Sequence, residues 1–483
     1  MSYGTLVRGG WVVLEGQGLQ EVDLALRDGK IVGILEPGQS AEAEEIIDAG
    51  GLVVLPGVID AHVHFGMGSS DDWVTESRAA VHGGVTCVLN YVMDARSYLE
   101  VGPEEREVAE RESVIDFGTH FILMNDQHLT EVPRYIKELG VASFKYFSNF
   151  KGNEGAYLGV TGTDNGFFYD LTRVVAQYPE AVLAVHTENI EVVWRLAASL
   201  KAAGRDGLAA WNESRPDFVE AHDMFTAFLF AEQTGCRTYI PHLSSALGLR
   251  TYREHLARGG RSWVETCPHY LTHTLGSELG TLVKVNPPVR EQKDADALWR
   301  AVADGGVAVV ASDHNSRKRV KKAGTIWSAS AGFPGVTTLL PVLLSEGHHK
   351  RGIPLERVAE LVSTNPARIF GLYPKKGSIS VGADADLTLV DLDCEQVVDS
   401  SSFGSHADYS IYDGWRLRGW PVTAVVRGRV VMHEGEVLVP GGYGRYIPRP
   451  VSSWTPPRAL RARQGFALRA ASDAPVTAGY AHV

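Results

Sequence analysis

The stretch GVIDAHVHF, residues 57–65, decides the fold that the sequence predicts. It is a short apolar run of the kind that forms a buried strand, and it carries two histidines, His62 and His64, near its end. Similar runs follow, separated by longer segments with a helical pattern. Alternating strands and helices predict an α/β protein built as a (β/α)8 TIM-like barrel. The eight predicted strands are residues 57–65, 84–90, 117–124, 140–147, 181–186, 237–242, 262–267 and 306–313.

The two ends of the chain have a different pattern, with short alternating apolar runs between glycine and Asp-Gly turns. TLVRGGWVV near the N-terminus and TAVVRGRVV near the C-terminus even resemble each other. We therefore predict that both ends build one small β-sandwich domain, with the barrel inserted between them. The predicted division is 1–55 and 376–444 for the β-sandwich, 56–375 for the barrel, and 445–483 for a tail on the surface or between subunits.

Composition narrows the partners and the compartment. The 483-residue chain has a net charge of −12, which argues against nucleic acid or a membrane as its main partner. Its four cysteines are scattered without a CxxC pair, which indicates a reducing compartment. The N-terminus has no signal-peptide pattern, and no apolar run approaches the ~20 residues of a spanning helix. The expected location is the cytoplasm.

Ionisable side chains stand at the carboxyl ends of five of the eight predicted strands. In a barrel of this type the chemistry takes place at that end. The i, i+2 spacing of His62 and His64 puts both imidazoles on one face of the first strand. Imidazole and carboxylate ligands suit zinc or a similar divalent ion. The remaining side chains of this set are Lys145, His186, His242 and Asp313.

Lys145 stands inside an apolar strand, GVASFKYF, although a lysine is costly to bury as an ammonium ion. One catalytic zinc usually takes three protein ligands, so four histidines and an aspartate exceed its needs. Two ions require a bridging group, and no glutamate stands at the right depth in the predicted strands. Burial lowers the pKa of a lysine, and the neutral amine can add carbon dioxide. We therefore predict that Lys145 becomes a carbamate (N6-carboxylysine) that bridges two metal ions.

Several motifs occur in order along the chain: PGVIDAHVHF, SFKYF, VHTEN, IPHLSS, ETCPHYL, KVNPPVR, SDHN and STNPARIFGLYPKKGSISVGADADLTLVD. Together they resemble the cyclic amidohydrolases, which include dihydropyrimidinase, hydantoinase, allantoinase and dihydroorotase. The resemblance extends over nearly the whole chain to about residue 447, and the details are most similar to hydantoinases and dihydropyrimidinases.

The resemblance implies a hydrolase of C–N bonds in cyclic amides, with two zinc ions, or manganese or cobalt in their place. A metal-bridging hydroxide would attack the ring amide carbon of a small cyclic amide or ureide. Asp313 would take the proton and deliver it to the leaving nitrogen. We also expect a homo-oligomer, a tetramer or a dimer. The implied ligands are His62, His64 and Asp313 for the more buried ion, His186 and His242 for the other, and carboxylated Lys145 for both.

Four positions depart from relatives within the group. Gly66 replaces an arginine that dihydroorotases typically use for the substrate carboxylate, which disfavours dihydroorotase. Phe150 replaces a tyrosine that helps to stabilise the oxyanion, and Ala331 replaces an asparagine in a segment resembling NGxPG. Asn286 stands at another substrate-contacting position, where many dihydropyrimidinases have serine. These departures favour a bulkier or more apolar substituted hydantoin, or a cyclic imide, over a dihydropyrimidine.

Other functions remain open at this point. L-selective hydantoinases and allantoinases also lack the tyrosine, so an allantoinase or a cyclic imide hydrolase with the same site is the main alternative. A non-catalytic scaffold related to dihydropyrimidinase is disfavoured, because all six metal positions are present. Loops at the barrel mouth should set selectivity: 65–73, 93–102 and 148–168, the last of which is glycine-rich and suited to a lid.

Overall fold

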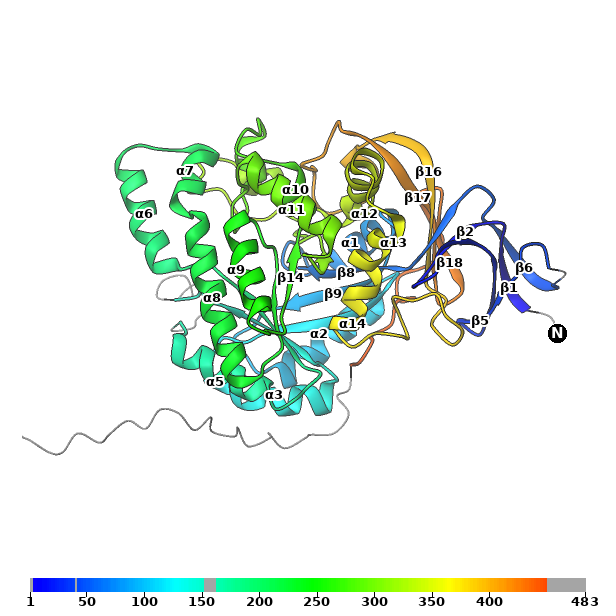
Figure 1. Cartoon of the computed structure of the whole chain (residues 1–483), viewed down its shortest axis with the longest axis horizontal. Helices are drawn as coiled ribbons and strands as arrows, with labels where there is room; N and C mark the ends of the chain where they lie inside the picture. The colour runs from blue at the N-terminus through cyan, green and yellow to red at the C-terminus, as the bar shows by residue number, and fades with distance from the viewer. Residues whose placement is uncertain (1–2, 40, 152–161, 450–483) are drawn as a thin grey trace, which may run out of the picture.

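The computed structural model describes residues 3–39, 41–151 and 162–449, and its centre is a curled parallel sheet of eight strands (Figure 1). The strands follow one another in the sheet in chain order, which is the arrangement of a (β/α)8 barrel. His64 N donates to His314 O (2.9 Å), which joins the first strand to the segment after the last. The strands are β8 (Val58–Val63), β9 (Val85–Val92), β10 (Asp116–Ile122), β11 (Ser143–Phe147), β12 (Val182–His186), β13 (Thr238–Ile240), β14 (Trp263–Thr266) and β15 (Val309–Val310).

Helices connect these strands and cover the outside of the sheet (Figure 1). Between β8 and β13 they are α1 (Asp72–His82), α2 (Tyr98–Glu112), α3 (Asp126–Leu139), α5 (Asn165–Val175), α6 (Ile190–Ala202), α7 (Gly207–Ser214) and α8 (Asp217–Thr234). After β13 they are α9 (Ala246–Ala257), α10 (Pro268–Thr272), α11 (Gln292–Asp304), α12 (Leu339–Val342), α13 (Leu355–Ala359) and α14 (Asn365–Ile369). Short turns of other helix types are η1 (Gly280–Val283), η2 (Arg319–Lys322), η3 (Val336–Thr338), η4 (Leu343–His349), η5 (Glu360–Thr364) and η6 (Ser400–Ser402).

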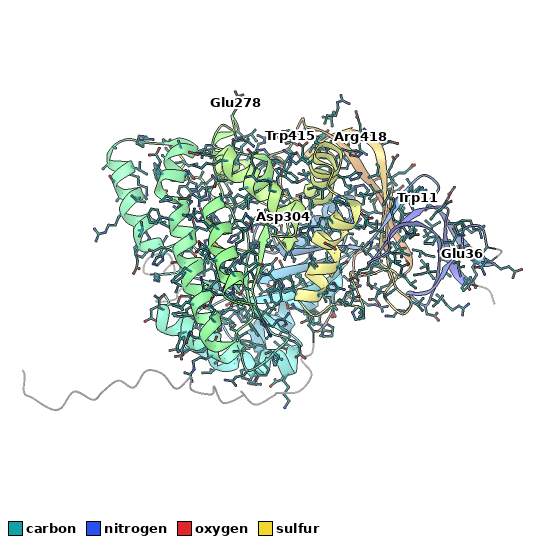
Figure 2. The ribbon with its side chains drawn as sticks, viewed as in Figure 1. Trp11, Glu36, Glu278, Asp304, Trp415 and Arg418 are labelled. Carbon is teal, nitrogen blue, oxygen red and sulfur yellow. The ribbon has the colours of Figure 1, made fainter. Side chains whose placement is uncertain are left out.

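Both ends of the described chain contribute strands to one β-rich region beside the barrel, on the right in Figure 1. Figure 2 shows Trp11 on this region and Asp304 among the barrel helices. A seven-stranded sheet combines strands from the two ends in the order β19-β18-β17-β16-β7-β2-β3, and a four-stranded sheet has the order β5-β4-β1-β6. The strands are β1 (Tyr3–Arg8), β2 (Trp11–Leu14), β3 (Gly18–Glu21), β4 (Asp23–Arg27), β5 (Lys30–Leu35), β6 (Ala43–Asp48), β7 (Val53–Pro56), β16 (Leu387–Val397), β17 (Arg416–Val426), β18 (Arg429–His433) and β19 (Glu436–Val437).

The predicted fold class is thereby confirmed, including the shared β-rich region. The two sequence pieces that resemble each other differ in structure. β17 and β18 pair as an antiparallel hairpin, whereas β1 and β2 lie in different sheets because β2 pairs with β3 and β7. In the described residues, no helix is both long and apolar enough to cross a membrane.

A buried ion cluster joins the barrel to the β-rich region. Lys376 Nζ lies 2.7 Å from Asp116 Oδ2, at the start of β10, and 3.1 Å from Asp384 Oδ2. The same ammonium group also pairs with Asp386, just before β16, and Arg427 pairs with Asp116. These ionised partners satisfy one another away from water, so the cluster fixes the position of one region on the other.

Residues 445–449 lie beneath the barrel, at the amino ends of its strands. Phe117 N donates to Arg445 O (3.0 Å), and Ile447 N donates to Phe117 O (2.7 Å). The buried side chain of Arg449 donates to Ser143 Oγ (2.6 Å) and to the carbonyl of Thr119. This part of the predicted tail therefore forms the floor of the barrel. The remainder of that tail, 450–483, lies outside the described residues.

Candidate active site

The first group of predicted ligands meets at the carboxyl ends of β8 and β15. His62 Nε2 lies 3.1 Å from Asp313 Oδ1, and His64 Nε2 lies 3.2 Å from the same oxygen. The three side chains offer ligand atoms that all lie within 4.8 Å of one another. Burial would raise the pKa of Asp313, but the adjacent His62 and His64 lower it well below its usual range. Asp313 therefore stays ionised at neutral pH.

The second group comes from the ends of β12 and β13. His186 Nδ1 lies 3.0 Å from His242 Nε2, so one nitrogen of each ring faces the other ring. Glu188 Oε2 lies 2.9 Å from His186 Nε2; because a carboxylate only accepts, Nε2 carries the hydrogen and Nδ1 keeps its lone pair. The ring centroids of His62 and His242 are 5.5 Å apart, which places the two groups side by side.

Two of these side chains stand on strained backbone. His242 has φ 45° and Asp313 has φ 52°, in the left-handed region that non-glycine residues seldom adopt. Such conformations cost of order 1–3 kcal/mol and persist where the surrounding structure imposes them, often at functional sites. His242 follows β13 and Asp313 follows β15. The left-handed backbone at these two residues turns both side chains into the cavity at the barrel mouth.

Lys145, on β11, is 1% exposed. Its Nζ has no hydrogen-bond partner among the described residues, and it lies 4.8 Å from the ring centroid of Tyr91 and 5.0 Å from that of Phe147. Burial lowers the pKa of Lys145 to about 8. A substantial share of the amine is therefore neutral near physiological pH, which is the form that reacts with carbon dioxide.

The donor set fits divalent metal ions. His62 Nε2, His64 Nδ1 and Lys145 Nζ are buried without a hydrogen-bond partner in the described part of the chain. The three side chains line one cavity, and buried nitrogens without a partner are costly unless something else binds them. Imidazole nitrogen, carboxylate oxygen and a carbamate in place of the amine are ligands that zinc and similar ions prefer.

All six predicted ligands line one cavity of about 180 Å³, together with the predicted substrate contacts. Phe150 stacks on Phe147, with centroids 4.4 Å apart, so the wall beside the lysine is apolar. Met67 and Met93 bring two of the predicted mouth loops to the wall, while α2 takes up the second half of the loop predicted at 93–102. Of the predicted lid, 152–161 lies outside the described residues. The remaining substrate positions, Asn286 and Ala331, also line this cavity.

The structure adds two acidic residues that the sequence analysis missed. Glu265, on β14, accepts from His242 N (3.0 Å) and lies 2.8 Å from His62 Nδ1, which leaves His62 Nε2 directed at the cluster. Asp60 accepts from His62 N (3.2 Å) and Ser312 N (3.1 Å), and burial raises its pKa to about 6. Carboxylates in such positions orient metal-binding histidines. For Glu265 the available signal was an acid inside the predicted strand SWVETC.

The segment that carries Ala331 is held by hydrogen bonds from two lysine side chains and one arginine side chain. Burial lowers the pKa of Lys284 to about 8 and that of Lys322 to about 6. Consecutive carbonyls of this segment accept from them, which fixes the backbone of this cavity wall. The hydrogen bonds run from Lys284 to Ala329 (2.5 Å), from Lys322 to Ser330 (2.9 Å) and from Arg317 to Ala331 (2.9 Å).

Comparison with known proteins agrees with this geometry. Residues 241–431 match the amidohydrolase family. The chain is 32% identical to an L-hydantoinase of Paenarthrobacter aurescens, over 90% of this chain and 96% of that protein. It is 36% identical to an allantoinase of Solibacter usitatus, over 90% of this chain and 95% of that protein.

Solved structures give the same result. A solved structure of the L-hydantoinase (dihydropyrimidinase) from Arthrobacter aurescens matches with a TM-score of 0.88 and 31% identity, over 92% of this chain and 100% of that one. This family implies a binuclear metal site, for which the cavity holds a fitting donor set. The chain therefore belongs to the amidohydrolase family, among the cyclic amidohydrolases of the hydantoinase type.

Proposed function

We propose that this protein opens the ring of a hydantoin, a dihydropyrimidine or a related cyclic ureide by hydrolysing an amide C–N bond. The observation that carries the proposal is the convergence of four histidines, Lys145 and Asp313 on one cavity, with three of their nitrogens unpartnered among the described residues. Allantoin is an alternative substrate, because allantoinases are similar to this chain over most of its length.

Two divalent ions, with zinc the first choice, would be held at this site. His62, His64 and Asp313 would hold one ion, and His186 and His242 the other. Lys145 would bridge them as a carbamate, since its buried and partly neutral amine suits that reaction. When bound, two such ions lower the pKa of water and polarise a carbonyl group.

Asp313 would move the proton in this reaction. It is ionised at neutral pH and 11% exposed at its side chain, so it can accept a proton from the attacking water at the cavity wall. It would then give that proton to the ring nitrogen as the C–N bond breaks. Water adds its oxygen to the carbonyl carbon, and the product is an N-carbamoyl amino acid or a related acid.

The first test combines metal analysis with a substrate panel. The purified protein should contain close to two divalent ions per chain and open at least one ring among dihydrouracil, 5-substituted hydantoins of both hands, allantoin, dihydroorotate and cyclic imides. A protein without bound divalent ion, and without hydrolysis after zinc or manganese is added, would instead favour a non-catalytic scaffold.

The carbamate has its own test. A Lys145→Ala variant should lose activity and regain part of it with added short carboxylic acids, which can occupy the place of the carbamate. Lys145→Arg, which keeps a cation but cannot form this carbamate, should not be rescued. Full activity of Lys145→Ala without rescue would contradict the bridging role.

We also propose that the chain divides near residues 55, 375 and 444 and acts in the cytoplasm as a homo-oligomer, a dimer or a tetramer. Free cysteines support a reducing compartment.

The oligomer is supported by an exposed apolar stripe on α8, where Phe218, Phe225 and Leu229 are 50%, 49% and 41% exposed. Light scattering should give a mass of two or four chains, and Phe225→Asp should lower it.

A further inference from the structure

Three asparagine side chains in the wall of the catalytic cavity have unmet hydrogen-bonding capacity. Asn149, Asn286 and Asn315 all line it, and the Oδ1 atom of each is buried without a hydrogen-bond partner among the described residues. Asn149 is 8% exposed and Asn315 is 6% exposed. Leaving a buried polar group unpaired costs about 1–3 kcal/mol, so three in one cavity indicate a ligand that pairs with them.

The three asparagines reach the cavity from different segments. Asn149 follows β11, Asn286 precedes α11, and Asn315 follows β15. The backbone around the last two is fixed, because Asn315 N donates to Phe333 O (3.0 Å) and Gly332 N donates to the carbonyl of Lys284 (3.0 Å). The amides therefore border the cavity at separate, positioned points, and the metal does not explain them, since zinc prefers imidazole, thiolate and carboxylate.

The charge of the cavity restricts what those amides can bind. Among the described residues that line it, Lys145 and Asp313 are the ones with a formal charge, and both belong to the proposed metal site. No arginine or further lysine lines the described wall to pair with a substrate carboxylate. A carboxamide can accept from an N–H or donate to a carbonyl, so it recognises uncharged amide and ureide groups.

A count of hydrogen-bonding groups separates substrates within that class. A hydantoin ring has two N–H groups and two carbonyls. The unmet asparagine atoms are oxygens, so each needs an N–H donor. If one ring nitrogen is the leaving group at Asp313, the other ring N–H satisfies one asparagine oxygen. The other two oxygens are then left for N–H groups outside the ring.

We propose that Asn149, Asn286 and Asn315 select an uncharged cyclic ureide that carries a second amide or ureide group outside its ring, in preference to a ring with an apolar substituent. This inference rests on the proposed ring-opening function and refines the expectation of an apolar substrate that Phe150 suggested. A buried polar site of this kind rejects an analogue that lacks the matching group, because its own groups are then left unpaired.

The test compares kcat/KM of the metal-loaded enzyme for allantoin and for 5-isopropylhydantoin, which share a ring and differ in the polarity of the arm. The wild type should prefer allantoin. Asn149→Leu, Asn286→Leu and Asn315→Leu should each lower that preference, and at least one should lower it by ~10-fold or more. Alanine variants at the same positions repeat the measurement if a leucine variant misfolds. Gln20→Leu, at an exposed amide on β3 of the β-rich region, is the control and should keep the wild-type preference.

A wild type that prefers 5-isopropylhydantoin, or asparagine variants that all keep the wild-type preference, would overturn the inference while the ring-opening function stands. An enzyme that opens neither ring nor any other in the panel would overturn the proposed function instead. In that case calorimetry decides the inference: allantoin should bind the wild type more tightly than Asn315→Leu, and equal or absent binding would reject it.

Discussion

A buried lysine stands in each of two clusters of charged side chains among the described residues. At the barrel mouth Lys145 Nζ has no hydrogen-bond partner among the described residues, whereas Lys376 makes ion pairs with Asp116, Asp384 and Asp386. Burial lowers the pKa of both lysines, but only at Lys376 do the carboxylates reverse the effect and raise the pKa above its usual range.

This difference in pairing indicates a structural role for the cluster around Lys376 and supports the proposed catalytic role of the cluster around Lys145. The three aspartates could themselves be taken for a metal site, since their oxygen atoms lie within 4.8 Å of one another. Lys376 already supplies the positive charge that an ion would bring. At the mouth, Lys145 Nζ, His62 Nε2 and His64 Nδ1 have no hydrogen-bond partner among the described residues, which supports the proposed ion site.

The largest expected effect comes from removing the mouth lysine. Lys145→Met should lower kcat/KM by on the order of 10⁴-fold, the scale of losing one member of a catalytic unit. In the metal-free protein its unfolding free energy should hold or rise, because a buried unpartnered amine is replaced by an apolar side chain of similar length. Substrate kinetics and urea unfolding of the same preparation measure both quantities, and a large loss of stability would show that Lys145 is structural.

The same substitution at the other lysine should act in the opposite way. Lys376→Met removes the cation that three buried carboxylates share and should cost about 3–5 kcal/mol of unfolding free energy. Asp116 and Asp384 keep a second partner, Arg427 and Lys30, whereas Asp386 loses its cation. Activity per folded molecule, corrected by circular dichroism at each temperature, should stay close to that of the wild type. A Lys376→Met protein that is as stable as the wild type and binds zinc at the three aspartates would contradict the structural role of the Lys376 cluster.

A smaller effect is expected from the carboxylate behind His62. Glu265→Gln weakens the hydrogen bond that His62 Nδ1 donates to residue 265, so His62 is oriented less firmly. The affinity for one of the two proposed ions should fall by ~10–100-fold. Competition with a chromogenic chelator measures this. Glu232→Gln is the control, because Glu232 makes a similar contact with His255 (2.7 Å) away from the cavity. Equal metal affinity in the two variants would contradict the orienting role.

The smallest effect concerns acid stability. Burial opposes ionisation of Asp384, but Lys376 and Lys30 outweigh it and lower its pKa in the folded state. The stability that Asp384 contributes is therefore present above its unfolded pKa and is lost as the pH falls through its lower folded value. Urea unfolding at pH 5 and pH 3 should show this decline, and the decline should be shallower in Asp384→Asn.

Much of the fold and of the metal site could be predicted from the sequence, because both leave local anomalies. Apolar runs bounded by turns predict strands, and a lysine or histidine at the end of such a run has few structural explanations. The six positions predicted in this way line one cavity. Their roles as ligands remain proposals.

Glu265 and the pair Asn149 and Asn315 were not predicted, for a different reason. Asparagine after a strand is an ordinary turn residue, and its unmet oxygen becomes visible only when the cavity is assembled. Glu265 contacts His62 across 203 positions of sequence, so no local pattern indicates the pair. The strands β7 and β16 are even farther apart in the chain, and their pairing was predicted only as a shared β-rich region.

The barrel floor formed by residues 445–449 has a consequence for biosynthesis. The strands β10 and β11 are synthesised early. The carbonyl of Gly140, just before β11, accepts a hydrogen bond from Arg449 N, and Arg449 is synthesised much later. At about 5–20 residues per second on the ribosome, the roughly 300 intervening residues take on the order of 15–60 seconds. Until then β10 and Gly140 lack the hydrogen-bond partners that residues 445–449 supply, and we expect chaperone contacts with a stalled chain to concentrate at these groups.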